Sequence, residues 1–175
     1  MRRADHIRFT GSYQSRDEAA ASLQTTGDAA LVQRGVPRML LLKCPCGCGD
    51  VLIVNLDKRS GPAWRMYRRR NAVSLYPSYW RDSKCGSHFI IWSNHIYWCD
   101  WDDDSIWSNP SDIEDRVLTA LTDRFVNYDE IADQLHEVPW DILQACYSLV
   151  RKGRAINNQP KRKGEFKRSN AEISN

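Results

Sequence analysis

Three cysteines stand at every second position in the segment Cys44-Pro45-Cys46-Gly47-Cys48-Gly49, between the apolar runs 39–42 and 51–54. Side chains two residues apart lie on the same side of an extended chain. The intervening proline and glycines allow the backbone to turn, so the thiols can converge on one point. Thiols spaced in this way beside glycines pack poorly as core, and the pattern therefore predicts a metal-binding turn between two paired strands.

A tetrahedral metal site needs four ligands, so further donors are expected downstream. The segment Cys85-Gly86-Ser87-His88 offers a thiol and an imidazole in one tight turn. The thiols expected to hold a structural zinc ion are those of Cys44, Cys46, Cys48, Cys85 and Cys99. Cys146 stands alone in a helical pattern and is interpreted as a core residue. Disulfides are not expected, because the chain begins with a polar segment and shows neither a signal peptide nor a membrane span, which favours a cytoplasmic location.

Composition predicts two modules and no general affinity for nucleic acid. The formal net charge of the 175 residues is only +3, although charge is clustered locally. Residues 65–70 and 161–168 are basic, whereas residues 100–104 are acidic. Seven tryptophans are many for this length, and the region 80–107 contains five of them: Trp80, Trp92, Trp98, Trp101 and Trp107. Such density favours a compact β core in which these side chains are buried.

The first part of the chain is predicted to form an N-terminal strand and helix followed by a β domain. Residues 1–28 contain a capping box, in which Ser15 precedes the helix and Glu18 stands three positions on. Residues 29–99 show alternating apolar and polar positions with turn signals between them, which is typical of small antiparallel sheets. One of these strands is expected to end at Tyr76, because Pro77 follows it.

The second part reads as a linker, a helical module and a tail. Residues 100–110 are acidic and are predicted to be a linker. Residues 111–156 show three helical repeats of apolar positions, which together with the extended segment after Gly153 predict a winged-helix-like module. Residues 157–175 are polar and basic and are predicted to be a disordered tail. The fold class is therefore α+β, a small mostly antiparallel β domain with a cysteine-rich zinc site followed by a winged-helix-like three-helix module.

Four motifs occur in an order that resembles a known family. They are Cys44-Pro45-Cys46-Gly47-Cys48-Gly49, Ser74-Leu75-x-Pro77-Ser78, Cys85-x-Ser87-His88-Phe89 and Asn94-x-Ile96-x-Trp98-Cys99. Over residues 27–99 the chain resembles a small bacterial family encoded beside ubiquitin-like conjugation genes of the Bub type. The resemblance implies a serine-dependent deconjugating peptidase that acts at the C-terminus of a ubiquitin-like protein. It also implies that this ubiquitin-like protein is the partner, with its E1-like and E2-like enzymes as further candidates.

A serine peptidase needs a hydroxyl, a base within hydrogen-bond reach of it and a group that orients the base. His88 is the favoured base, because the five thiols already exceed the four ligands of one zinc ion; its use as a zinc ligand stays open. Ser78 is the first candidate for the nucleophile. Ser87 is the second, since neighbours on a strand face opposite sides. Asn94 or Asp57 are candidates to orient the imidazole.

Two other functions compete with the peptidase. The first is a zinc-bearing adaptor without chemistry, which would recruit protein or nucleic acid through the winged helix. Nucleic acid is not the expected partner, because residues 112–154 are acidic overall and the third helix has no basic residue before Arg151. The second is a hydrolase that uses zinc-bound water, although thiolate-rich sites are more often structural. No membrane partner is expected.

Overall fold

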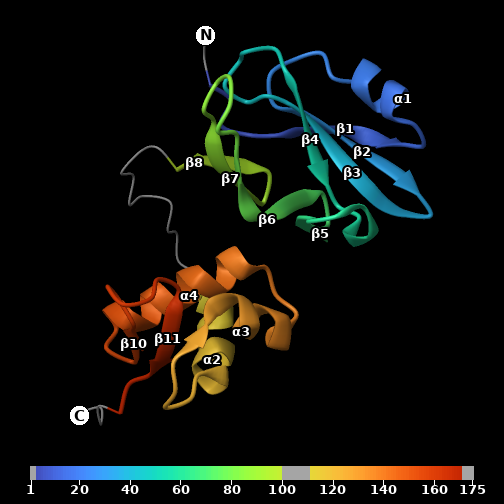
Figure 1. The fold of residues 1–175 in the computed structure, drawn as a ribbon. Helices are drawn as coiled ribbons and strands as arrows, with labels where there is room; N and C mark the ends of the chain where they lie inside the picture. The colour runs from blue at the N-terminus through green and yellow to red at the C-terminus, as the bar shows by residue number, and fades with distance from the viewer. Residues whose placement is uncertain (1–2, 100–110, 171–175) are drawn as a thin grey trace. The chain divides into compact units, whose positions relative to one another are not determined.

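The computed structural model describes residues 3–99 and 111–170, which belong to two compact units of the chain. Unit 1 spans Met1–Asp102 and unit 2 spans Asp103–Asn175 (Figure 1). The predicted linker, residues 100–110, lies outside the described residues. Among the described helices, none has both the length and the apolar character needed to cross a membrane.

The first sheet of unit 1 contains four strands in sequence order. These are β1 (Arg8–Tyr13), β2 (Asp28–Arg34), β3 (Val36–Lys43) and β4 (Val51–Asn55). Strand β1 runs parallel to β2, and the other pairs are antiparallel. The parallel pair requires a crossover, and helix α1 (Arg16–Ala21) lies within it. The capping box predicted for this helix is confirmed, since Ser15 and Glu18 each accept the other's backbone N–H.

The second sheet of unit 1 follows a short 3-10 helix, η1 (Lys58–Ser60). Its four antiparallel strands are β5 (Arg65–Arg69), β6 (Ala72–Trp80), β7 (His88–Trp92) and β8 (His95–Trp98), again in sequence order. The two sheets share one hydrophobic core, to which β3 contributes Leu40 and Leu42 and β7 contributes Phe89 and Ile91. The mostly antiparallel β domain predicted for residues 29–99 is thus observed.

Strand β6 is longer than the sequence predicts. The expected end at Tyr76 is wrong, because the strand continues through Pro77 and Ser78 to Trp80. Leu75 pairs with Ile91 and Tyr79 with Phe89, so three residues of β6 face a single residue of β7. This bulge takes Pro77 out of the ladder, where its missing N–H group costs no hydrogen bond.

Unit 2 alternates helices and short strands. In sequence order they are α2 (Ser111–Ala120), β9 (Val126–Asn127), α3 (Tyr128–Leu135), α4 (Pro139–Arg151), β10 (Ala155–Asn157) and β11 (Glu165–Arg168). The three strands form one antiparallel sheet in the order β10-β11-β9. Cys146 is fully buried in the core between the helices, as predicted.

The predicted disordered tail is wrong for residues 157–170. Strand β11 lies inside that segment and pairs with both β10 and β9. Phe166 of β11 is completely buried, and its ring meets that of Tyr147 edge-on at 5.2 Å between centroids. One aromatic side chain among eight mostly basic residues, 161–168, gives too little periodicity to reveal a strand from the sequence. Residues 171–175 lie outside the described residues.

Candidate active site and metal centre

The bulge in β6 brings Ser78 to His88. The Oγ atom of Ser78 lies 3.1 Å from Nε2 of His88, which is a hydrogen-bond distance. Trp80 is the residue of β6 directly opposite His88. Because side chains alternate along a strand, Ser78 lies on the same face as Trp80 and is the diagonal neighbour of His88. The sequence places these two residues in separate motifs, and the pairing of β6 with β7 joins them.

This face of the sheet points away from the core. Tyr79 and Phe89 occupy the other face, where their rings stack at 5.6 Å between centroids within the core of unit 1. His88 is half-buried, and the ring of Trp80 lies 6.0 Å from the imidazole. The Trp80 side chain is nevertheless 68% exposed. The hydroxyl and the imidazole are therefore in contact with each other and accessible from solvent.

Neither residue suggested for orienting the imidazole does so. The side-chain amide of Asn94 accepts a hydrogen bond from the backbone of Val73 and donates one to the carbonyl of Asn71, which fixes the turn between β7 and β8. The carboxylate of Asp57 caps η1 and forms ion pairs with Arg38 and Arg59. Both predictions are wrong because each side chain is already engaged in local structure elsewhere in unit 1.

Four of the five predicted metal ligands form a cluster. The sulfur atoms of Cys44, Cys46, Cys48 and Cys85 all lie within 4.8 Å of one another. Cys44 Sγ is 3.3 Å from Cys46 Sγ and 3.8 Å from Cys85 Sγ. Four thiolates around one tetrahedral zinc ion at about 2.3 Å would be separated by roughly 3.8 Å, so the spacing fits such an ion. This donor set could therefore hold a metal ion.

Cys99 lies outside this cluster. It follows β8, and its backbone N–H donates to the carbonyl of His88 at 2.9 Å. The same register places Trp98 opposite Phe89, so Cys99 is the cross-strand neighbour of His88. The structure therefore pairs the backbone of Cys99 with that of His88, and Cys99 is not among the four clustered thiols.

Ser87 belongs to the cysteine cluster. Its side chain is only 5% exposed, and its hydroxyl lies 3.2 Å from Cys85 Sγ and 3.8 Å from Cys44 Sγ. Burial acts to raise the pKa of Cys85, but hydrogen bonds from the hydroxyl and backbone of Ser87 outweigh it and hold that pKa at about 6. Ser87 thus stabilises the thiolate form, which is the form that binds metals. Its hydroxyl is directed at sulfur, on the face opposite His88.

Ion pairs stabilise the loop around the cysteine cluster. Asp50 follows the cysteine turn and forms ion pairs with Arg81 at 2.8 Å and with Lys84 at 3.1 Å. Hydrogen bonds to Lys84, and then to Arg81, lower the pKa of the Asp50 carboxyl below its ordinary value. These pairs connect the β3–β4 turn with the segment between β6 and β7. Cys44 and Cys85 belong to the same two segments, and their sulfur atoms are in contact.

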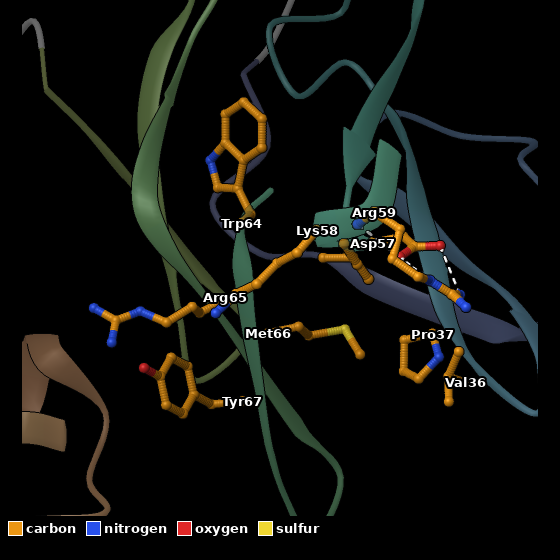
Figure 2. Close-up of a pocket in the computed structure, with 10 residues that line it drawn as sticks. Val36, Pro37, Asp57, Lys58, Arg59, Trp64, Arg65, Met66 and Tyr67 are labelled. Carbon is orange, nitrogen blue, oxygen red and sulfur yellow. Dashed lines mark hydrogen bonds and ion pairs between the residues drawn. The ribbon is translucent and has the colours of Figure 1, made fainter. Parts of the chain in front are cut away.

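A cavity of about 560 Å³ lies on the β5 side of unit 1. Figure 2 shows Met66 of β5 facing Pro37 of β3 across it, with Lys58 and Arg59 at its border. Trp64 also lines this cavity, and its indole N–H donates to the carbonyl oxygen of Ser78 at 3.4 Å. No motif in the sequence points to Trp64 or Trp80 as functional residues. Trp80 belongs to the tryptophan-rich region 80–107, for which burial is predicted, and Trp64 lies outside that region.

A serine hydroxyl hydrogen-bonded to an imidazole is the arrangement on which serine hydrolases depend. Residues 15–99, which contain both side chains and the cysteine cluster, match the family model described as the bacterial ubiquitination-like system serine protease, BubE. The match confirms the resemblance to this family that the sequence motifs predict. No curated protein and no solved structure gives a significant match to the chain.

Proposed function

We propose that the chain is a serine peptidase that cleaves the peptide or isopeptide bond after the C-terminus of a bacterial ubiquitin-like protein. One observation carries the proposal, the 3.1 Å contact between Ser78 Oγ and His88 Nε2 inside the segment that matches the family. The family description supports a protease that works in a ubiquitination-like system. The ubiquitin-like protein, together with the enzymes that conjugate it, is accordingly the proposed partner.

In this mechanism Ser78 donates its proton to Nε2 of His88 as its Oγ attacks the carbonyl carbon of the scissile bond. The tetrahedral intermediate collapses when the imidazolium returns that proton to the leaving amine, which leaves an ester between Ser78 and the ubiquitin-like protein. A water molecule, deprotonated by the same imidazole, then hydrolyses the ester. The reacting tautomer of His88 carries its proton on Nδ1, so that Nε2 is free to accept.

The oxyanion of this intermediate requires hydrogen-bond donors. A bulge leaves a peptide group of the longer strand outside the ladder, and the bulge of β6 ends at Ser78. The backbone N–H of Ser78 is therefore the proposed first donor, because it belongs to the nucleophile itself and moves with it.

The cysteine cluster is proposed to hold a structural zinc ion. Zinc accepts four thiolates in a closed tetrahedral site, which matches the four clustered sulfur atoms. Ser87 is proposed to support the ligands and not to be the nucleophile, because its hydroxyl contacts the sulfur of Cys85. Such an ion would supply folding free energy to unit 1, and the proposed reaction uses Ser78 and His88 alone.

Unit 2 is proposed to be a winged-helix-like module that binds protein. Its order of elements, helix, strand, two helices and a β hairpin, supports this fold. With the hairpin included, residues 111–170 carry ten acidic and ten basic residues, so the acidic balance predicted for residues 112–154 alone no longer argues against DNA. Helix α4 still has no basic residue before Arg151. A titration with duplex DNA should therefore show no salt-sensitive binding that depends on unit 2.

The peptidase proposal is tested with single alanine variants and a fusion of the ubiquitin-like protein to a reporter. Ser78→Ala and His88→Ala should each reduce kcat by at least about a thousandfold, because nucleophile and base act as one unit. Ser83, an exposed serine of the β6–β7 segment, gives the matched control, and Ser83→Ala should cleave normally. A fluorophosphonate probe should label Ser78 in the wild type. Full activity of Ser78→Ala, with the fold retained, would refute the proposal.

A further inference from the structure

Strand β6 has an open edge at the nucleophile. The neighbouring strand β5 begins at Arg65, which pairs with Tyr76, whereas β6 continues to Trp80. Before β5 the chain leaves β6, since the backbone N–H of Trp64 donates to the carbonyl of Asn55 in β4. Among the described residues, no strand pairs with residues 78–80 on this side.

The peptide groups of Trp80 face that open edge. The N–H of Arg81 donates to the carbonyl of Ser87, so the peptide groups of Arg81 point toward β7. Because the backbone N–H and C=O groups of successive residues point to opposite sides of a strand, those of Trp80 point away from β7, toward the open edge. The carbonyl of Ser78 shares this direction, as its contact with the indole of Trp64 shows.

An apolar side chain lies beside this edge. Among the large hydrophobic side chains exposed in the described part of the chain, Trp80 has the highest fraction of its surface open to solvent, at 68%. Its ring lies on the same face as Ser78 and His88, next to the imidazole. A peptide bond that Ser78 attacks must approach at this point, so the edge and the indole both adjoin the path of the substrate.

We propose that the C-terminal segment of the substrate binds as an added strand along residues 78–80 of β6. Its backbone forms hydrogen bonds with the N–H and C=O groups of Trp80, and the indole of Trp80 packs over its side chains. This mode recognises an extended, unfolded segment through its main chain. The inference rests on the proposed function, because it takes the bond attacked by Ser78 as its reference point.

The hydrogen bonds are tested with substrate peptides in which one amide at a time is replaced by an ester. The probe is the C-terminal segment of the ubiquitin-like protein joined to a fluorogenic amine. In an added strand only every second residue directs its N–H toward β6. The value of kcat/KM should therefore fall by about two- to tenfold at the position whose N–H meets the C=O of Trp80 and change little at the positions on either side of it.

The indole is tested by Trp80→Ala and Trp80→Phe. Trp80→Ala should raise KM about tenfold or more while kcat changes less, and Trp80→Phe should restore most of the loss. Ile53→Ala is the matched control, since Ile53 is also an exposed apolar residue of a strand, 41% exposed on β4. Its KM should equal that of the wild type.

The possible failures are distinguishable. Normal cleavage of all ester peptides, or equal losses at neighbouring positions, would overturn strand addition and leave the peptidase intact. An unchanged KM in Trp80→Ala would overturn the role of the indole. Absence of cleavage of the unmodified peptide and of the protein fusion by the wild-type chain would instead refute the proposed function on which the inference rests.

Discussion

Replacing Phe166 with alanine should strongly destabilise unit 2. The ring of Phe166 is completely buried and contacts Tyr147 edge-on in a core that also contains Ile142 and Leu149. Removing a buried phenylalanine side chain costs about 3–5 kcal/mol, from lost apolar burial and from the cavity left behind. A unit of this size is stabilised by roughly 5–15 kcal/mol in total, so a large share of its stability would be lost.

The assay is thermal unfolding of the full chain followed by far-ultraviolet circular dichroism. Most helical residues lie in unit 2, in α2, α3 and α4, so the helical signal reports on that unit. A loss of 3 kcal/mol should lower its midpoint by roughly 10 to 20 °C. Ile156→Ala is the control, because Ile156 lies on the same hairpin with 42% of its surface exposed and should shift the midpoint only slightly. Truncation after Asn158 removes β11 and should act like Phe166→Ala; an unchanged midpoint in both would refute the docking of the tail.

Two further predictions concern unit 1. Burial acts to raise the pKa of Asp28, but hydrogen bonds from Arg8, Thr25 and Gln24 outweigh it and lower that pKa. The ionised carboxylate therefore stabilises the fold fully above the ordinary carboxyl pKa, and this stabilisation is lost as the pH falls through the lowered value. Asp28→Asn should therefore cost on the order of 2 kcal/mol at neutral pH in chemical denaturation, with a difference from the wild type that shrinks in acid; a constant difference would contradict this. Ser87→Ala should weaken zinc binding about 10- to 100-fold in competition with a chelator while zinc-loaded enzyme keeps its kcat. Loss of kcat with normal zinc affinity would return Ser87 to the role of nucleophile.

Local signals in the sequence predicted much of unit 1. The capping box at Ser15 and the cysteine turn between two apolar runs depend on residues a few positions apart, and both are found where expected. The choice of His88 and Ser78 used chemistry and motif order, and the structure brings them into contact. The zinc ligands were predicted as five thiols, and the pattern alone could not show which four converge.

Signals that depend on pairing between distant residues were missed. The bulge that directs Ser78 toward His88 exists only in the register of β6 against β7, and Pro77 alone suggested that the strand ends. Trp80 was expected to be buried on composition, whereas its strand position turns it outward. The buried position of Phe166 could not be predicted, because basic residues surround it in the sequence. Its four-residue strand β11 is recognised only from its pairing with β9 and β10.

The cysteine cluster connects the two sheets of unit 1 close to Ser78 and His88, the proposed nucleophile and base. Cys44, Cys46 and Cys48 lie in the turn between β3 and β4 of the first sheet, while Cys85 lies three residues before His88, where β7 of the second sheet begins. An ion held by all four thiolates would therefore fix the start of the strand that carries His88. Structural zinc supplies folding free energy on the order of 10 kcal/mol, so a chelator should unfold unit 1 and abolish cleavage at the same rate.

Intrinsic tryptophan fluorescence and cleavage of the fusion, measured in parallel during chelation, should then decay together, and Ser78→Ala should retain its zinc. Cleavage that disappears while unit 1 is still folded, with the contact of Ser78 and His88 preserved, would discard the serine mechanism in favour of metal-bound water.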